Sequence, residues 1–453
     1  MELDPKQSTN ATAGRASSLA EVRVTPADWQ RACLSELALQ FFSGGTPSTK
    51  VASFWNGSIP WTTSAYIDRL YIRDGVKRIT SEGLASSSSK IVPAGNLLIG
   101  TRVGVGKVAI NTVDLAISQD LTGMVLDRFR VTPEFVAYSL MTDQAQDWFR
   151  TSTRGTTIKG VPRDDLLRLN IAVPPLPEQR AIAQILRTVQ RAREATEAVI
   201  AATRELKKSL MRHLFTYGPV PVDQADQVSL KETEIGPVPE HWRVVTLNEI
   251  SSGALRNGIF IKRPKWGSGL RYLNVADTYK SAVADVTQLT RIDVTPVPPL
   301  VFRVRNGEIV FVRSSLKREG VAMACTVPVF NEPILFDCHL IKVPIDTKAA
   351  APRYVVEYCR SSLGHPRLIA LSKSTTMTTI PQSNLGGFAM PLPLLAEQVG
   401  IANTLEALDR KLDVETQRRT ALDALFKSLL EHLMTGRVRV SDAELQEAAE
   451  VVG

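Results

Sequence analysis

The chain is poor in the residues that build disulfide frameworks and metal centres. It has four cysteines and five histidines among 453 residues. No two cysteines stand in a CxxC spacing and no two histidines in an HxxxH spacing, which are common metal-site spacings. Cys338-His339 is the one adjacent couple, and a single couple is more typical of packing than of a zinc site. We therefore interpret the cysteines as reduced, buried thiols of a cytoplasmic protein.

Long apolar runs are missing as well. The sequence contains no stretch of 18 apolar residues, so it predicts no membrane-spanning helix. The segment 1–18 lacks the apolar core of a secretory signal. We expect residues 1–21 to form a disordered lead-in.

Several catalytic motifs are absent. The glycine-rich stretch 100–108 resembles a phosphate loop, but Thr101 stands where the motif needs glycine and Val108 follows the lysine where it needs Ser or Thr. The chain has no dinucleotide-binding GxGxxG between a strand and a helix, no nucleophile elbow, no acidic nuclease cluster and no Asn-Pro-Pro-aromatic motif of amino-methyltransferases. The sequence therefore favours a binding protein over an enzyme.

Composition is ordinary for a globular protein, with 44% hydrophobic and 22% charged residues. The net charge of +8 is compatible with nucleic acid as a partner. Alone it is weak support, since many enzymes are equally basic.

A helical segment occurs twice. The first copy opens at Pro177, and its Glu178 matches Glu397 at an offset of 219 positions. An internal repeat is strong information about architecture. Further pairs at this offset are Gln179 with Gln398, Ile182 with Ile401, Ala183 with Ala402, Leu186 with Leu405, Arg191 with Arg410, Leu206 with Leu425, Lys208-Ser209-Leu210 with Lys427-Ser428-Leu429, and His213-Leu214 with His432-Leu433.

Both copies carry apolar residues that alternate by three and four, the pattern of a coiled coil. Each helix is too long to bury its stripe against its own domain, so we expect the two to pair as an antiparallel coiled coil. The first seam is Ile182, Ile185, Val189, Ala192, Thr196, Val199, Thr203, Leu206 and Leu210. The second seam is Ile401, Leu405, Leu408, Leu412, Glu415, Arg419, Leu422, Phe426, Leu429 and Leu433.

The repeat also covers the segments before the helices. Each begins with proline, two residues and tryptophan, at Pro26 to Trp29 and at Pro239 to Trp242. Glycine-punctuated, β-branched runs predict short strands at 91–110 and 301–324. Helices are expected at 133–149 and 352–363, each opened by proline. Before the long helices, Thr156 to Pro162 aligns with Thr375 to Pro381 at the same offset.

These patterns predict an α+β protein with two β-rich mixed α/β domains in tandem, each followed by a long helix. In this arrangement the chain resembles the specificity subunits of type I DNA restriction–modification enzymes. The resemblance rests on Gly45-Thr46-Pro47-Ser48, on the segment 54–61 (FWNGSIPW), on the segment 235–242 (IGPVPEHW), and on Pro175 to Arg180 with Ala396-Glu397-Gln398. Domain two lacks the Trp-rich opening of domain one and has the segment 256–260 instead.

The resemblance implies two target-recognition domains that read the two halves of an interrupted DNA sequence. The predicted parts are a lead-in at 1–21, target-recognition domain 1 at 22–174, spacer helix 1 at 175–217, a linker at 218–240, target-recognition domain 2 at 241–391, spacer helix 2 at 392–436 and a tail at 437–453. The expected partners are double-stranded DNA, two methyltransferase subunits and a restriction/translocase subunit. This chain would hold no cofactor; S-adenosylmethionine, ATP and Mg would belong to the partner subunits.

Basic, aromatic and amide side chains in glycine- and serine-rich turns are the candidate DNA contacts. They are Lys50, Trp55, Trp61, Arg102, Lys107, Arg154 and Lys159 in domain one, and Arg256, Asn257, Lys262, Arg263, Lys265, Arg313, Lys317, Arg318 and Lys373 in domain two, with Gln382 as a further adenine-reading amide. Candidate contacts of the helices with partner subunits are Arg187, Arg191, Lys207 and Arg212.

Two other classes of function stay open on the sequence alone. A coiled-coil adaptor that binds only protein would carry the same repeat, and salt-sensitive DNA binding would distinguish it. An enzyme with an unrecognised site would be revealed by methyl transfer or DNA cleavage by the purified chain.

We predict that the purified chain neither methylates nor cleaves DNA, because the motifs of both reactions are missing. Methylation should appear only when a methyltransferase subunit with its own cofactor site is added. The measurement is transfer of labelled methyl groups from S-adenosylmethionine to DNA; transfer by the chain alone would contradict the prediction.

Overall fold

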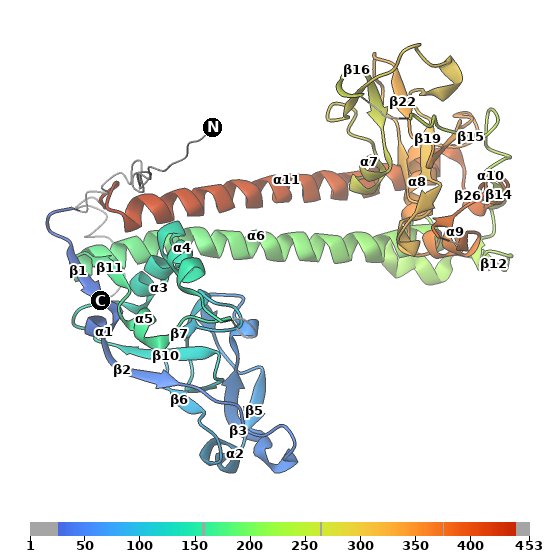
Figure 1. Cartoon of the computed structure of the whole chain (residues 1–453). Helices are drawn as coiled ribbons and strands as arrows, with labels where there is room; N and C mark the ends of the chain where they lie inside the picture. The colour runs from blue at the N-terminus through green and yellow to red at the C-terminus, as the bar shows by residue number, and fades with distance from the viewer. Residues whose placement is uncertain (1–25, 156–158, 263–264, 375, 441–453) are drawn as a thin grey trace, which may run out of the picture. The chain divides into compact units, whose positions relative to one another are not determined.

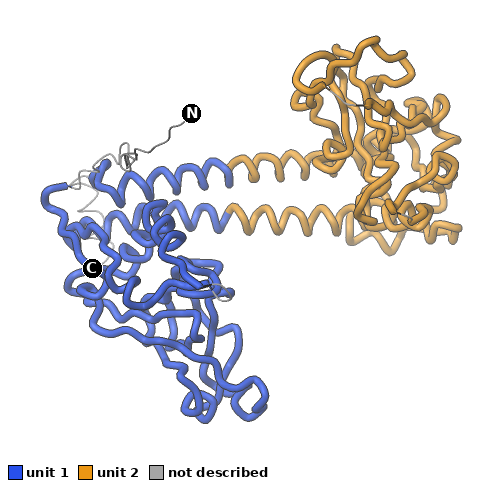
Figure 2. Tube along the Cα trace, viewed as in Figure 1, with its two compact units in different colours: residues 1–195, 419–453 blue, residues 196–418 orange. Residues whose placement is uncertain are grey.

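The computed structural model describes residues 26–155, 159–262, 265–374 and 376–440. The chain divides into two compact units (Figure 2): unit 1 comprises residues 1–195 and 419–453, and unit 2 comprises residues 196–418. Among the described residues, no helix is both long and apolar enough to cross a membrane.

The two predicted long helices are confirmed. They are α6 (Leu176–Tyr217) and α11 (Leu395–Met434), of 42 and 40 residues. The boundary between the units crosses both helices (Figure 2), so each unit contains part of each helix. Proline residues directly before each helix end the preceding strand and preset the first helical turn.

Within each unit the helices pair in opposite directions. In unit 1, Ile182 and Leu186 share a buried cluster with Leu430 and Leu433. In unit 2, residues 210–215 share a cluster with residues 401–405. Residue numbers rise along α6 while the partner numbers fall along α11, which is the predicted antiparallel pairing.

The predicted seam of α11 is confirmed, and so is that of α6 except at two positions, Val199 and Leu206, where the next residue occupies the seam instead. Val199 and Leu206 are exposed, whereas Ile200 is 4% exposed and Lys207 is 18% exposed. Lys207 donates to Asp409 of α11 at 2.6 Å. At 206–207 the sequence favours the apolar Leu206 over Lys207 as the seam residue. The ion pair with Asp409 allows Lys207 to occupy the seam instead.

Unit 1 contains two mixed sheets below the helix pair (Figure 1). The first has the order β2 (Ala38–Ser43), β10 (Leu121–Leu126), β7 (Leu97–Gly100), β8 (Val108–Asn111) and β4 (Tyr71–Ile72). The second has the order β5 (Lys77–Ile79), β3 (Trp55–Thr62), β9 (Leu115–Ile117) and β6 (Lys90–Val92). The other elements are β1 (Gln30–Cys33) paired with β11 (Asn170–Val173), and helices α1 (Leu34–Leu37), α2 (Ser81–Ala85), α3 (Pro133–Met141), α4 (Asp143–Ser152) and α5 (Arg163–Leu167).

Unit 2 is built on the same plan. Its sheets have the orders β15 (Arg256–Asn257), β23 (Leu340–Val343), β19 (Ile309–Val312), β21 (Ala324–Thr326), and β17 (Arg291–Asp293), β16 (Lys265–Leu273), β22 (Ile334–Phe336), β18 (Arg303–Val304). Shorter pairings join β20 (Ser314–Ser315), β25 (Thr378–Thr379) and β24 (Lys373–Ser374), β14 (Arg243–Thr246) with β26 (Ala389–Leu392), and β12 (Leu230–Lys231) with β13 (Val238–Pro239). Its short helices are α7 (Val275–Lys280), α8 (Pro352–Arg360), α9 (His365–Ala370) and α10 (Gln382–Gly386).

The offset of 219 is exact for three further pairs of elements: α3 with α8, α5 with α10, and β11 with β26. One predicted helix is corrected. The segment 133–149 is two helices, α3 and α4, because Thr142 is extended and its hydroxyl accepts a hydrogen bond from the Ala145 backbone N–H as an N-cap. The aligned closing segments include residues 156–158 and 375, which lie outside the described residues.

A buried glutamine attaches each long helix to its domain. The Gln179 side chain accepts from the Thr132 N–H at 2.9 Å and donates to the Arg130 and Pro174 carbonyl oxygens. Gln398 makes the same three bonds with Ala351, Ala349 and Pro393. All three partners are offset by 219, so the repeated Glu-Gln is explained by the backbone groups that the glutamine satisfies.

The glutamate beside each glutamine binds the repeated tryptophan. The Trp29 indole N–H donates to Glu178 at 3.1 Å, and the Trp242 indole N–H donates to Glu397 at 3.4 Å. The tryptophan of Pro-x-x-Trp and the glutamate of Glu-Gln therefore form one contact in each copy, which closes each domain onto the start of its helix.

The displaced seam gives a stability prediction with a matched control. Ile200→Ala should lower the free energy of unfolding by about 2–5 kcal/mol, because it empties a buried position. Val199→Ala, one residue away and 39% exposed, should change it by no more than about 0.5 kcal/mol. Denaturant unfolding followed by helical circular dichroism measures both; equal effects would restore the seam expected from sequence.

Candidate nucleic-acid interface

Each unit has a hairpin loop closed by the same two backbone hydrogen bonds. In unit 1 the Gly100 N–H donates to Lys107 at 2.8 Å and the Gly106 N–H donates to Gly100 at 3.0 Å. In unit 2 the Val312 N–H donates to Met323 and the Ala322 N–H donates to Val312, both at 2.8 Å. Gly106 and Ala322 both have positive φ, +80° and +59°. The residues between these bonds form structurally equivalent loops.

A second segment lies against each loop. The Val161 N–H donates to Thr101 at 2.8 Å, and the Ile380 N–H donates to Arg313 at 2.9 Å. In unit 1 Arg154 and Gly160 form an isolated bridge beside the loop. In unit 2 the same place holds the three-stranded pairing of β20, β25 and β24. The backbone thus joins two distant parts of the sequence into one surface in each unit.

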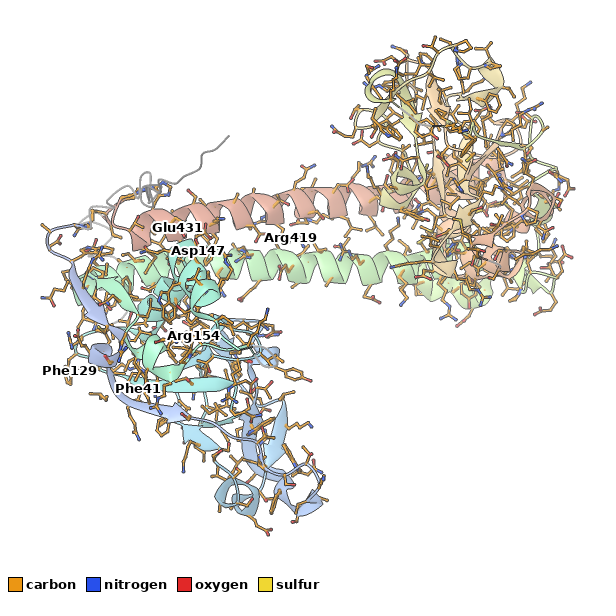
Figure 3. All side chains as sticks on the ribbon, in the orientation of Figure 1. Phe41, Phe129, Asp147, Arg154, Arg419 and Glu431 are labelled. Atoms are coloured by element: carbon orange, nitrogen blue, oxygen red, sulfur yellow. The ribbon has the colours of Figure 1, made fainter. Side chains whose placement is uncertain are left out.

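These surfaces gather eight of the predicted DNA contacts. Hairpin surface 1 consists of Arg102, Lys107, Arg154 and Lys159; hairpin surface 2 consists of Arg313, Lys317, Arg318 and Lys373. All are exposed except Arg313, which is half-buried. Arg154 follows the end of α4 (Figure 3) and pairs with Asp165 at 2.9 Å. Two clusters of cations on turns that are closed by backbone hydrogen bonds suit recognition of phosphates and base edges.

In each unit a glycine allows a third segment to pack closely against the neighbouring backbone. A Cβ on Gly44 would meet the Ser118 carbonyl oxygen at 2.1 Å, and one on Gly258 would meet the Phe336 oxygen at 2.1 Å. The exposed lysines Lys50 in unit 1 and Lys262 in unit 2 follow these glycines a few residues later in the sequence. No larger residue than glycine fits these positions.

The predicted adenine-reading amides contact each other. Nε2 of Gln382 lies 2.7 Å from Oδ1 of Asn257. The equivalent pair in unit 1 is Arg163 and Ser43, and the Arg163 guanidinium donates to the Ser43 hydroxyl at 3.1 Å. Arg256, beside Asn257, is exposed on the edge strand β15. A base that used either amide would have to replace or share this bond.

The predicted tryptophan contacts serve packing in the structure. Trp61 is buried and its indole donates to the Gly45 carbonyl oxygen at 3.0 Å. Trp55 is half-buried and donates to the Ser48 oxygen at 3.1 Å. Their rings lie 5.4 Å apart in a T-shaped arrangement. Both indoles therefore fix the loop 45–48, and Trp61 in particular is enclosed rather than presented to a ligand.

Unit 2 has a structural counterpart of Trp55, although the start of its domain lacks a Trp-rich segment. Trp266 and Leu270 both pair with Ile292, as Trp55 and Ile59 both pair with Ile79. Trp266 also makes a T-shaped contact with Tyr272, at 5.8 Å. Sequence comparison missed this match because its offset is 211 rather than 219. Trp266 is 54% exposed and stands beside the exposed Lys265; Arg263, predicted with them, lies outside the described residues.

A compact acidic turn orders the start of hairpin surface 2. Asp337 accepts from the Tyr272 hydroxyl at 2.6 Å and from the His339 backbone and imidazole at 2.7 and 2.9 Å. The His339 carbonyl oxygen then accepts from the Arg313 N–H at 2.6 Å. Asp337, Cys338 and His339 are close enough to share a metal ion. However, burial raises the pKa of Cys338, which disfavours the thiolate that a metal would need.

The predicted partner-binding residues differ in exposure. Arg187, Arg191 and Arg212 are exposed on α6. The placement of Lys207 among the exposed residues is corrected, because its ammonium pairs inside unit 2 with Asp409 at 2.6 Å and with Glu357 at 3.4 Å.

Comparison with known proteins agrees with this architecture. The family model for the type I restriction modification DNA specificity domain matches residues 26–202 and 239–424. The type I restriction enzyme MjaVIII specificity subunit of Methanocaldococcus jannaschii is 22% identical over 424 residues, covering 92% of this chain and 94% of that protein.

Two solved structures share the fold. The S subunit of the type I restriction-modification system from M. genitalium has a TM-score of 0.59 at 14% identity, covering 91% of this chain and 98% of that chain. A chain from work on complex assembly and conformational transition of the type I R-M system has a TM-score of 0.54 at 16% identity, covering 92% and 100%.

Hairpin surface 2 gives a binding prediction. Lys317→Ala with Arg318→Ala should weaken binding to double-stranded DNA and reduce the slope of log K against log salt, by up to about one unit for each lost phosphate contact. The control is Lys348→Ala, an exposed lysine of unit 2 outside the surface. Fluorescence anisotropy at several salt concentrations measures both; an unchanged slope in the double variant would remove these residues from the interface.

Proposed function

Because the chain belongs to the family of type I restriction modification DNA specificity domains, we propose that it reads an interrupted DNA target in two halves, one with each unit. The observation that carries the proposal is the duplicated hairpin surface. Two equivalent backbone frames hold different side chains, with Arg102, Lys107, Arg154 and Lys159 in one and Arg313, Lys317, Arg318 and Lys373 in the other. Equivalent frames with different side chains suit two half-sites of different sequence.

The long helices would set the spacing between the half-sites. Both α6 and α11 run uninterrupted from one unit into the other. A continuous α-helix is a stiff element that rises about 1.5 Å per residue. A stiff connection admits one gap between half-sites and loses half of the contacts at any other.

The helices would also receive the partner subunits. Exposed arginines of α6, namely Arg187, Arg191 and Arg212, offer charged docking points for two methyltransferase subunits. S-adenosylmethionine would bind to those subunits, and ATP and Mg to a restriction/translocase subunit. This chain would contribute the choice of DNA sequence and the chemistry would remain with its partners.

The decisive experiment is to map modified adenines in the genome of the source cell with this gene present and deleted. The proposal expects an interrupted sequence whose modification disappears with the gene. Modification that persists unchanged in the deletion strain would reject it.

The spacing role gives its own prediction. Four residues inserted after Thr196 add about 6 Å of helix and about 40° of net rotation, a stutter that a coiled coil tolerates. The gap between half-sites should grow by one or at most two base pairs, at ~3.4 Å each, while the bases of each half stay the same. Sequencing of modified sites measures the gap. An active variant with the parental gap would show that the linker at 218–240 or the partner subunits set the spacing; four residues inserted in that linker are the matched control.

A further inference from the structure

Unit 2 contains a basic cavity where three helices meet. The cavity has a volume of about 270 Å³ and lies between α6, α8 and α11. Its charged lining residues are Arg204, Lys207, Lys208, Glu357 and Arg360. None of its lining residues belongs to hairpin surface 2.

The acidic residues at the cavity are already neutralised. Glu357 is 1% exposed and pairs with Arg353 and with Lys207, the latter at 3.4 Å. Asp409 pairs with the same two cations, Lys207 at 2.6 Å and Arg353. The two acids share these two bases, so their direct ion-pair partners are Lys207 and Arg353 rather than the other cations of the cavity.

Those remaining cations are Arg204, Lys208 and Arg360. Arg360 donates only to carbonyl oxygens, those of Thr278 at 3.0 Å, Ala324 at 2.8 Å and Tyr279 at 3.4 Å. Burial lowers the pKa of its guanidinium. Glu357 and Asp409 act on Arg360 at longer range, but neither forms an ion pair with it. An anion in direct contact would further offset the cost of burying this cation. Among the residues that the structure describes, Lys208 pairs with Glu205 at 3.9 Å, with both side chains exposed.

The equivalent place in unit 1 is filled and balanced. At the offset of 219, Arg204 corresponds to Asp423 and Ser362 corresponds to Asp143. Asp423 pairs with Arg193 at 2.6 Å, and Asp143 pairs with Lys427, the counterpart of Lys208, at 3.1 Å.

The other counterparts in unit 1 complete the filling. Phe426, at the position of Lys207, packs on Tyr138 and under Arg193. Glu431 of α11, labelled in Figure 3, accepts from the Asp143 N–H at 2.6 Å. All three of these acids have non-acidic counterparts in unit 2, namely Arg204 for Asp423, Ser362 for Asp143 and Arg212 for Glu431.

We propose that this cavity is an oxyanion site which receives the carboxylate of an acidic side chain from one methyltransferase subunit. The inference rests on the proposed function and adds to it a specific docking point that only unit 2 offers. A protein carboxylate fits better than the DNA backbone, because the cavity lies on α6, α8, α11 and the turn after α8, and none of the predicted DNA contacts lines it. The two partner subunits therefore bind through different contacts, one of them dependent on Arg204, Lys208 and Arg360.

The test gives unit 2 the acids of unit 1. Arg204→Asp with Ser362→Asp places carboxylates where Asp423 and Asp143 stand in the other copy, so the frame already accommodates them. Lys348→Asp is the matched control, a charge reversal in unit 2 away from the cavity. Sedimentation velocity measures association of the full chain with the methyltransferase subunit. The double variant should lose at least about tenfold in affinity for one of two methyltransferase copies, and the control should lose none.

Three results would overturn the inference. Unchanged methyltransferase affinity in the double variant, while the parent chain binds two copies, rejects the cavity alone and leaves the proposed function standing. A loss of affinity for duplex DNA without a loss for the methyltransferase assigns the cavity to a DNA phosphate. Inorganic phosphate could also stabilise the parent chain against heat, while the double variant loses this stabilisation and still binds the methyltransferase. That result assigns the cavity to a free anion. A parent chain that binds no methyltransferase at all rejects the proposed function itself.

Discussion

The attachment of each long helix to its domain is the constraint on which the rest of the structure depends. Gln179 and Gln398 are fully buried, and the side chain of each makes hydrogen bonds with three backbone groups. One group lies directly before the long helix, and the other two lie in the segment before α3 or α8. A buried amide that lost these partners would cost about 1–3 kcal/mol for each unsatisfied group. The helix direction relative to its own domain is thereby fixed at the first turn, and every contact further along the helix inherits it.

Duplication has preserved this attachment while the surroundings have diverged. Around Trp29, the second contact of Glu178 is Arg439, at 2.6 Å, which also pairs with Asp28 at 2.8 Å. Around Trp242, the second contact of Glu397 is His241, at 3.1 Å. The tryptophan–glutamate bond is retained in both copies, and the charges that reinforce it differ. The same division holds for the hairpin surfaces, where the backbone hydrogen bonds are shared and the side chains that would meet a ligand are not.

That division has a physical basis. Backbone closure of the hairpin needs only two hydrogen bonds and one residue that accepts positive φ, which Gly106 and Ala322 both supply. Side chains that point to solvent carry little folding energy, so their identity is free to follow the ligand. A recognition protein built from repeats can therefore change what it binds without changing how it folds.

The sequence by itself determined the repeat, the two long helices and their antiparallel pairing, because apolar periodicity and a constant offset survive divergence. It also identified the loops that carry the basic residues. Only the tertiary structure decided which of those residues share a surface, since Arg102 and Arg154, or Arg313 and Lys373, are brought together by strand pairing between distant segments. It also moved the seam of α6 to Ile200 and Lys207, matched Trp266 with Trp55, and enclosed Trp61. In each of these cases the position of the side chain depends on a residue far away in the sequence. The contacts are the ion pair of Lys207, the strand pairing across the β-bulge at Trp266 and the indole hydrogen bond of Trp61. The local sequence pattern carries no information about such partners.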